Sequence, residues 1–312
     1  MNEEKKISLV VSAYNEQDGL RQFYDTSKKI MEDLQEKCGY PFQFCFVNDG
    51  STDRTGEILA ELKDLDPEHI KTITFSRNFG HEAAMTAGLD YAEGEYLIFM
   101  DADLQHPPAC IPSIMEKFEE GYEIINMVRT QNRDAGAIGG FASALFYRII
   151  NSVSDAEMLP AASDFFAMNA RAADVLRNNY REKVRFLRGF VQNIGFHKTA
   201  LEYEAAPRAA GKSHYSFRRL VKLSVDAMTC FSDLPLKLGI YAGFFSGFLG
   251  VLLIIYTLIT RNGAPSGYAT IVIVLCFMFA VLFLLLGIIG GYISILFREV
   301  KDRPIYIVKD IR

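Results

Sequence analysis

The chain has 312 residues, of which 50% are hydrophobic and 23% are charged, and its formal net charge at pH 7 is −5. The hydrophobic share is high for a water-soluble protein, and the length allows one large domain with an appendage. The negative charge argues against a nucleic-acid partner, and five scattered cysteines without a Cys-x-x-Cys pair argue against a disulfide framework or a zinc site.

The first part of the chain alternates short apolar runs with longer helical patterns. Strands are predicted at Ile7–Ser12, Phe42–Val47, Ile70–Phe75, Tyr96–Met100 and Glu123–Val128. Helices are predicted near Gln17–Lys37, Asp53–Leu65, His81–Ala92 and Ala109–Glu120. This alternation is typical of an α/β domain in which right-handed crossovers build a mostly parallel sheet covered by helices.

Polar and acidic residues follow four of the predicted strands, and the carboxyl ends of parallel strands share one edge of a sheet. The four loops read SAYNE (Ser12–Glu16), NDGSTD (Asn48–Asp53), SRNFGHEAA (Ser76–Ala84) and DADLQH (Asp101–His106). The chain has no Gly-x-Gly-x-x-Gly turn and no Walker loop, which argues against a Rossmann dinucleotide site and a P-loop. A carboxylate-lined nucleotide site with a divalent cation over the phosphates fits these loops better.

Asp101 and Asp103 are central to this prediction because they follow the apolar run Leu97–Met100 directly. Two carboxylates one residue apart at the edge of a sheet can hold a hard divalent cation such as Mg²⁺ or Mn²⁺. The same acids would also serve as caps of the helix that Pro107 and Pro108 introduce. Taken alone, the pair does not decide between these two roles.

Two long uncharged stretches, Leu238–Thr260 and Asn262–Phe297, are interrupted only by Arg261. Each is longer than the ~20 apolar residues that a membrane-spanning helix needs, so the sequence predicts a transmembrane helical hairpin. A buried core hairpin is the alternative, although two consecutive helices that are apolar on every face rarely suit a soluble domain. Glycines at four-residue spacing in these stretches permit close helix contact, either within the hairpin or between the protomers of a homo-oligomer.

The cations near the two stretches predict the orientation of the hairpin. They lie before the first stretch and after the second, at Arg218, Arg219, Lys222, Lys237, Arg298, Lys301 and Arg303. By the positive-inside rule, both termini are expected in the cytoplasm of a cell whose plasma membrane holds the hairpin. The charged start of the chain, MNEEKK, does not resemble a signal peptide.

Seven sequence features, spread along essentially the whole chain, occur in an order that is informative as a set. They are VVSAYNE, VNDGSTD, SRNFGHEAAMTAGLDYA, MDADLQHPP, RAAGKSHYSF, the apolar helix pair and EVKDRPIYIV. As a set they resemble the family-two glycosyltransferases of the GT-A fold, and within them the polyprenyl-phosphate glycosyltransferases. The resemblance implies metal-dependent, inverting transfer of a sugar from a nucleotide-diphosphate donor to a membrane lipid phosphate, undecaprenyl phosphate in bacteria. It also implies a partner membrane and an envelope glycosylation role.

The resemblance divides the chain into four segments. Residues 1–215 are expected to form a cytoplasmic GT-A domain, and residues 216–236 an amphipathic juxtamembrane segment. Residues 237–298 would form the transmembrane hairpin and residues 299–312 a cytoplasmic tail. UDP-linked hexoses or N-acetylhexosamines are the first expectation for the donor, with GDP-mannose second.

The family's residue roles transfer by position. The nucleotide contacts would be Ala13, Tyr14, Glu16, Asp49 and Asp101, and the metal ligands Asp101, Asp103 and Gln105. The acceptor phosphate would be held by Arg208, Lys212 and Ser213. Catalytic roles are expected for Asp103, Asp164, Arg129 and Arg133.

Chemical reasoning supports the cations in this set, because a phosphate acceptor is already ionised and the enzyme must bring two anions together. Arg129 and Arg133 would alternatively be solvated surface charges, and Arg208 and Lys212 would only attract anionic lipid headgroups. Asp164 would alternatively cap a turn. The sequence departs from the family at SDFF (Ser163–Phe166), where Phe166 stands in place of a common arginine.

Two other functions compete with this interpretation. A processive polysaccharide synthase of the same fold resembles this chain, but such enzymes carry a Gln-x-x-Arg-Trp motif and this chain has no tryptophan. A catalytically silent membrane protein that binds a sugar nucleotide is the second alternative. The retained DADLQ and RAAGKS segments argue against it.

Overall fold

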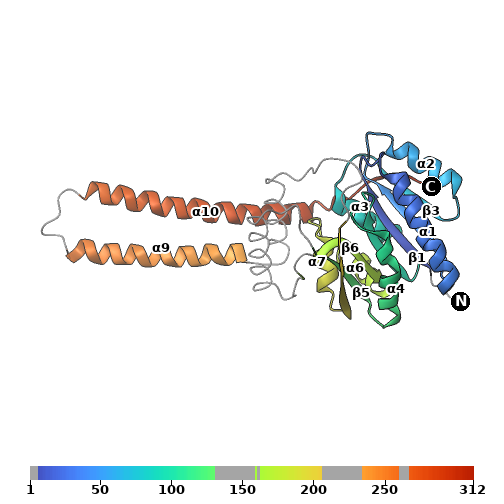
Figure 1. Cartoon of the computed structure of the whole chain (residues 1–312). Helices are drawn as coiled ribbons and strands as arrows, with labels where there is room; N and C mark the ends of the chain where they lie inside the picture. Colours follow the sequence, from blue (N-terminus) through green and yellow to red (C-terminus); the bar gives the residue numbers. More distant parts are fainter. Residues whose placement is uncertain (1–5, 131–158, 160–161, 206–233, 260–266) are drawn as a thin grey trace. The chain divides into compact units, whose positions relative to one another are not determined.

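The structure is a computed structural model that describes residues 6–130, 159, 162–205, 234–259 and 267–312 (Figure 1). The chain forms two compact units. The sheet unit contains the described residues up to Ala205 together with Pro304–Arg312, and the hairpin unit contains those from Leu234 to Arg303.

The sheet unit contains one mixed sheet with helices on both faces. Its strands are β1 (Ile7–Ala13), β2 (Phe42–Asn48), β3 (Ile70–Phe75), β4 (Tyr96–Asp101), β5 (Ile124–Arg129), β6 (Ala162–Asn169), β7 (Lys198–Tyr203) and β8 (Val308–Ile311). Its α-helices are α1 (Leu20–Cys38), α2 (Thr55–Leu65), α3 (His81–Tyr91), α4 (Ile111–Glu119), α6 (Ala170–Asn179) and α7 (Leu187–Asn193), with a 3-10 turn η1 (Pro108–Cys110).

The strand order is β7-β5-β6-β4-β1-β2-β3-β8. Strands β3, β2, β1 and β4 are parallel neighbours, and β5 pairs in parallel with β7. The predicted mostly parallel α/β sheet is therefore confirmed, and each of its five predicted strands agrees with the structure to within one residue at either end. Three strands were not predicted. Two of them are antiparallel: β6 lies between β4 and β5, and β8 is an edge strand beside β3. The third, β7, is the edge strand that pairs in parallel with β5.

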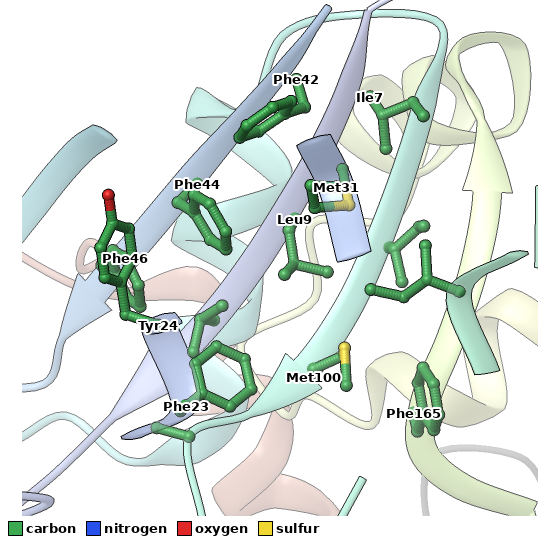
Figure 2. Packing of buried hydrophobic residues seen from close by; sticks show 14 of the residues in the cluster. Ile7, Leu9, Phe23, Tyr24, Met31, Phe42, Phe44, Phe46, Met100 and Phe165 are labelled. Carbon is green, nitrogen blue, oxygen red and sulfur yellow. The ribbon is translucent and has the colours of Figure 1, made fainter. Parts of the chain in front are cut away.

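One face of the sheet carries the largest apolar cluster (Figure 2). Alternate residues of β1 and β2, such as Leu9 and Phe44, pack there against Phe23 and Met31 of α1. Helices α2 and α4 contribute to the same cluster, while α3, α6 and α7 cover the opposite face. The alternation of side chains along each strand means that Ser12 and Asp101 point to the α3 face.

Helix α3 packs unusually close to that opposite face because of a glycine. A Cβ atom on Gly88 would lie 2.1 Å from Cγ1 of Val10 on β1. Only the missing side chain permits this approach of helix to sheet. The position of α3 matters because its first residue, His81, reaches the edge of the sheet where the predicted site lies.

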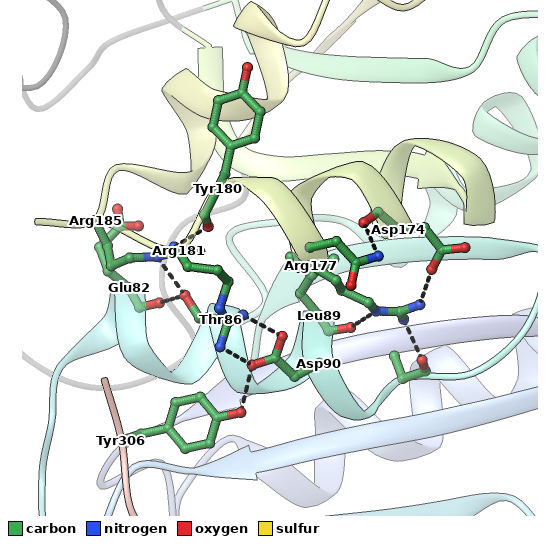
Figure 3. Close-up of polar contacts among 12 residues, drawn as sticks. Glu82, Thr86, Leu89, Asp90, Asp174, Arg177, Tyr180, Arg181, Arg185 and Tyr306 are labelled. Carbon is green, nitrogen blue, oxygen red and sulfur yellow. Dashed lines mark hydrogen bonds and ion pairs between the residues drawn. The ribbon is translucent and has the colours of Figure 1, made fainter. Parts of the chain in front are cut away.

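The C-terminal residues are part of the sheet unit. Strand β8 pairs with β3, and the ring of Tyr306 stacks on Phe75 at a centroid distance of 5.1 Å. The Tyr306 hydroxyl donates a 2.6 Å hydrogen bond to Asp90 of α3, which also receives Arg181 at 2.7 Å (Figure 3). The segment expected as a tail, 299–312, is thus divided between the two units. Its first five residues belong to the hairpin unit, and its last nine belong to the sheet unit.

The hairpin unit consists of α9 (Leu234–Ile259) and α10 (Tyr268–Val300), which pack side by side. Within the described residues, Phe277–Val300 is long and apolar enough to cross a membrane, and Gly243–Leu252 is a shorter apolar segment. Of the glycines expected to bring helices together, Gly243 lies near α10, since a Cβ built on it would be 3.9 Å from Cδ1 of Leu285. A Cβ on Gly247 would meet open space. Close packing within the hairpin therefore accounts for only part of the glycine pattern.

Candidate active site

The loop after β2 is organised by Asp49. Its carboxylate accepts hydrogen bonds from the backbone of Phe79 at 2.7 Å and Gly80 at 2.9 Å, and from the Asn78 amide at 3.0 Å. The side chain is only 2% exposed, and burial raises its pKa against the opposing effect of these bonds. The geometry gives Asp49 a structural role in fixing the loop before α3, and its expected nucleotide contact stays a prediction.

The loop after β1 carries three further expected nucleotide contacts. Ala13 is buried at the end of β1, and its carbonyl accepts the Asp49 backbone N–H at 3.0 Å. The ring of Tyr14 is 46% exposed, so a flat face is open at the rim. The backbone N–H of Glu16 donates to the Thr55 hydroxyl at 2.9 Å, which ties this loop to the start of α2.

The loop after β4 is a tight turn that brings the expected metal ligands together. Leu104 has a positive φ of 62°, and the Gln105 backbone N–H donates to Asp103 at 3.0 Å. The backbone N–H of Asp101 donates to Nδ1 of His106 at 3.1 Å. That nitrogen is therefore an acceptor. Since it carries no proton, its 3.9 Å distance to the Asp101 carboxylate is not an ion pair.

The residues of this turn fit a divalent cation whose coordination shell is completed by substrate and water. Among the described residues no group of three or more His, Cys, Asp or Glu side chains could hold a metal ion. Mg²⁺ in proteins commonly uses one or two carboxylates, with substrate phosphates and waters completing its octahedron. The carboxylates of Asp101 and Asp103, with the amide of Gln105, match that donor chemistry at an accessible edge of the sheet.

Asp164 lies on β6, directly beside this turn. The antiparallel pairing of β4 and β6 includes Phe99 with Phe166, so the end of β4 with Asp101 and the start of β6 with Asp164 lie at the same edge of the sheet. Nε2 of His81 is 3.6 Å from Asp164, and Nδ1 is 3.6 Å from Asp101. Burial alone would lower the pKa of His81, but the two carboxylates raise it to about 10.

A second cation reaches Asp164 from α7. The Arg188 guanidinium lies 3.5 Å from the Asp164 carboxylate and donates to the Ala162 carbonyl at 3.0 Å. Burial would raise the pKa of Asp164, but the charge of Arg188 and the contact with His81 hold it well below its usual range. Asp164 is thus a fixed carboxylate rather than a proton donor, and its alternative as a simple turn cap is less well supported.

The helix that carries Arg188 is itself attached to α3. The backbone N–H of Leu187, the first residue of α7, donates to Glu82 at 2.8 Å. Burial raises the pKa of this carboxyl, and the nearby charge of Asp164 adds to the effect. The starts of α3 and α7 therefore meet at one edge of the sheet.

The remaining predicted residues are only partly covered by the structure. Arg129 is the last residue of β5. Burial raises the pKa of Tyr203, and the positive charge of Arg129 opposes this rise. Four residues, Arg133, Arg208, Lys212 and Ser213, lie outside the described residues. Phe166, which replaces the family's arginine, is 1% exposed and stacks on Phe99 at 4.7 Å, so it serves the core.

Sequence reasoning missed two residues of this site. His81 is not among the predicted site residues, yet it lies in the loop that follows the third strand, at the predicted edge of the sheet. Its position in the loop SRNFGHEAA was therefore an available signal. Arg188 carried no local signal, because only the fold of β6 and α7 brings it to Asp164.

Comparison with known proteins agrees with this geometry. Residues 8–176 match the model of glycosyl transferase family 2, and residues 234–296 match the GtrB C-terminal hairpin. The chain belongs to glycosyl transferase family 2. It is a glycosyltransferase with a C-terminal hairpin, as the sequence resemblance implied.

Several curated members of family 2 match along nearly their whole length. An uncharacterized glycosyltransferase, YkcC of Bacillus subtilis, is 38% identical, covering 99% of this chain and 95% of the relative. The putative glycosyltransferase CsbB of Bacillus subtilis is 34% identical, covering 97% of this chain and 91% of the relative. The SfII prophage-derived bactoprenol glucosyl transferase of Shigella flexneri is 33% identical, covering 97% of both chains.

Proposed function

We propose that this family-2 enzyme transfers a sugar, with inversion, from a nucleotide-diphosphate donor to a polyprenyl phosphate at the cytoplasmic face of the plasma membrane. The observation that carries the proposal is the turn with Asp101 and Asp103 at the carboxyl edge of the sheet, in a chain that also has the GtrB hairpin. The name of the Shigella flexneri relative, a bactoprenol glucosyl transferase, supports a polyprenyl phosphate acceptor. Undecaprenyl phosphate is the acceptor of first choice, and cell-envelope glycosylation is the proposed use of the product.

The donor would bind along the edge formed by the β1, β2 and β4 loops. Tyr14 offers an exposed ring at the rim, beside Ala13, Glu16 and Asp49. Asp101, Asp103 and Gln105 would hold Mg²⁺ or Mn²⁺, which would stabilise the charge that develops on the leaving diphosphate. For the donor itself we propose a UDP-linked hexose or N-acetylhexosamine before GDP-mannose.

The acceptor phosphate needs positive charge rather than a strong base, because it is already ionised at neutral pH. Arg129 at the end of β5 and Arg133 soon after it are proposed to face this phosphate. The RAAGKS segment would supply Arg208, Lys212 and Ser213 from the juxtamembrane side. Charge-assisted hydrogen bonds of this kind also orient the attacking oxygen.

Strand β8 supports the proposed two-helix topology. The chain leaves the sheet unit before α9 and returns to it at Pro304. A folded unit lies on one side of a bilayer, so a chain that leaves and re-enters it must cross an even number of times. Together with the exposed aromatic residues of α9, such as Phe244 at 73%, this favours two spanning helices with the sheet unit on one side of the membrane. The cations beside the hairpin support the cytoplasm as that side.

The function is tested with membranes that contain the enzyme, undecaprenyl phosphate and a panel of radiolabelled nucleotide sugars. We expect label in the lipid extract, and loss of that label in excess EDTA. Asp103→Ala should abolish transfer without changing the circular dichroism spectrum, whereas the exposed Asp64→Ala should transfer normally. Full activity of Asp103→Ala would refute the metal role, and absence of labelled lipid with every donor would refute the proposed reaction.

The topology is tested with protease on right-side-out vesicles. The sheet unit should be fully protected until detergent opens the vesicles, because both of its connections to the hairpin lie inside. Digestion of the sheet unit in intact vesicles would overturn the orientation.

A further inference from the structure

Two carboxylates from neighbouring strands lie close to one another at this edge of the sheet. Asp101 ends β4 and Asp164 is near the start of β6, and each carboxylate is 3.6 Å from the His81 ring. Like charges that lie close together on adjacent strands destabilise a sheet. Both side chains are only about one third exposed, at 32% and 28%, so water screens their repulsion incompletely.

His81 lies between these two carboxylates, and the contacts define where its protons are. The Ser12 hydroxyl donates to Asp101 at 2.8 Å, so its oxygen is left to accept from Nδ1 of His81 at 3.2 Å. Nε2 on the other side of the ring faces Asp164 at 3.6 Å. The imidazole therefore lies between the two carboxylates, connected to Asp101 through the Ser12 hydroxyl and in direct contact with Asp164.

The other charged groups around the pair do not replace this bridge. Nδ1 of His106 accepts the Asp101 backbone N–H, so it brings no proton to the carboxylate. Arg188 contacts Asp164. Among the described residues, the charged contacts of Asp101 are with histidines and not with Arg188. Glu82, the next residue of α3, is acidic and binds the start of α7.

We propose that His81 is a positioning residue that bridges Asp101 and Asp164, holding the donor-side carboxylate and the β6 carboxylate in one fixed arrangement. In the absence of a divalent cation, its ring is the group that lies between the two carboxylates. When a cation and donor bind at Asp101 and Asp103, the bridge keeps Asp164 in place beside the reacting sugar. This second step rests on the proposed function, whereas the bridge itself does not.

The bridge is tested first by a double-mutant cycle on the full-length protein in detergent with EDTA. The variants are His81→Phe, which keeps a flat ring of similar volume, Asp164→Asn and the double variant. Thermal unfolding is followed by circular dichroism, because the chain has no tryptophan for fluorescence. His81→Phe should lower the melting temperature by about 2–4 °C, the shift expected for one partly exposed charge interaction in a unit of this size.

The cycle separates bridging from packing. In the Asp164→Asn background, the same His81→Phe change should lower the melting temperature by less than half as much, because one of the two carboxylates that His81 contacts is already absent. An equal loss in both backgrounds would overturn the proposal. His197→Phe is the matched control, since His197 stacks on Tyr122 away from the site, and its loss should not depend on residue 164.

The role in the reaction is tested by steady-state kinetics. His81→Phe should lower kcat by about tenfold or more while the donor KM changes by less than about twofold, because the bridge orients groups rather than binding the nucleotide. His81→Lys places several hydrogen-bond donors near the two carboxylates, and it should recover at least about threefold of the lost kcat. A His81→Lys enzyme no faster than His81→Phe would overturn this role.

Added Mn²⁺ distinguishes failure of the bridge from failure of the metal site. Mn²⁺ with UDP should raise the melting temperature of His81→Phe more than that of the wild type, since the cation provides Asp101 with a contact that this variant has lost. Equal shifts in the two proteins would count against the bridge. If the wild type shows no shift at all, the proposed metal site fails, and the cycle in EDTA still decides the role of His81.

Discussion

The contact between Tyr306 and Asp90 allows a quantitative prediction about how the end of the chain holds the sheet unit. Tyr306→Phe removes one hydroxyl and keeps the ring that stacks on Phe75. The lost hydrogen bond is 2.6 Å long and its acceptor is a carboxylate whose side chain is 17% exposed. A bond to a charged group contributes about 1.5–3 kcal/mol, and we expect the lower end because Arg181 still pairs with Asp90.

A loss of about 1.5 kcal/mol corresponds to a fall in melting temperature of about 3–6 °C for a domain of this size. The measurement is thermal unfolding of the full-length protein in detergent, with Tyr122→Phe as the ring-retaining control. Asp90→Asn provides the double-mutant cycle, in which the Tyr306→Phe loss should shrink because the charged acceptor is absent. An unchanged melting temperature, or an equal loss in the Asp90→Asn background, would refute the reasoning.

The same pair predicts a pH dependence. Burial, together with the hydrogen bond to Asp90, raises the pKa of Tyr306 above its usual value near 10. Since the folded state favours the protonated phenol, the stabilisation is complete below pH ~10 and is lost as the pH rises further. The difference in stability between the wild type and Tyr306→Phe should therefore be constant near neutrality and decrease above pH ~10.

Two further changes test the packing of α3 and the acceptor site. Gly88→Ala should destabilise the protein by about 1–3 kcal/mol, because the new methyl group would overlap Val10, whereas Gly19→Ala, whose nearest contact is 3.8 Å away, should unfold at nearly the wild-type temperature. Arg208→Gln should raise the KM for a short-chain polyprenyl phosphate or lower kcat in neutral detergent, by an amount equivalent to ~1.5–3 kcal/mol, and wild-type kinetics there would leave Arg208 only a role in attracting anionic lipids.

The sequence by itself determined the central part of the sheet. Strands β1 to β5 are short apolar runs bounded by polar loops, so local composition and period predict their type and nearly their ends. The edge where ligands bind also follows from sequence, because parallel strands connected by helices must direct their carboxyl ends the same way. Asp101 and Asp103 could therefore be placed at that edge, and the ordered set of motifs led to the correct family.

Tertiary structure alone decided which distant residues join that edge. Strand β6 inserts between β4 and β5 in the antiparallel direction, and this pairing brings Asp164 to the edge of the sheet where β4 ends at Asp101. His81 reaches the two carboxylates because Gly88 lets α3 approach β1 closely. These contacts depend on pairings between segments more than 60 residues apart, and local periodicity carries no information about which partner a strand or helix chooses.

The C-terminal strand shows the same limit. Val308–Ile311 is too short and too polar to be recognised as a strand, since its lysine and aspartate are adjacent and its four positions show no apolar alternation. It becomes a strand because the edge of β3 offers backbone partners, and because Tyr306 finds Phe75 and Asp90 beside it. The amino-acid sequence determined the chemistry available to this protein, whereas long-range strand pairing and helix packing decided which side chains meet to use it.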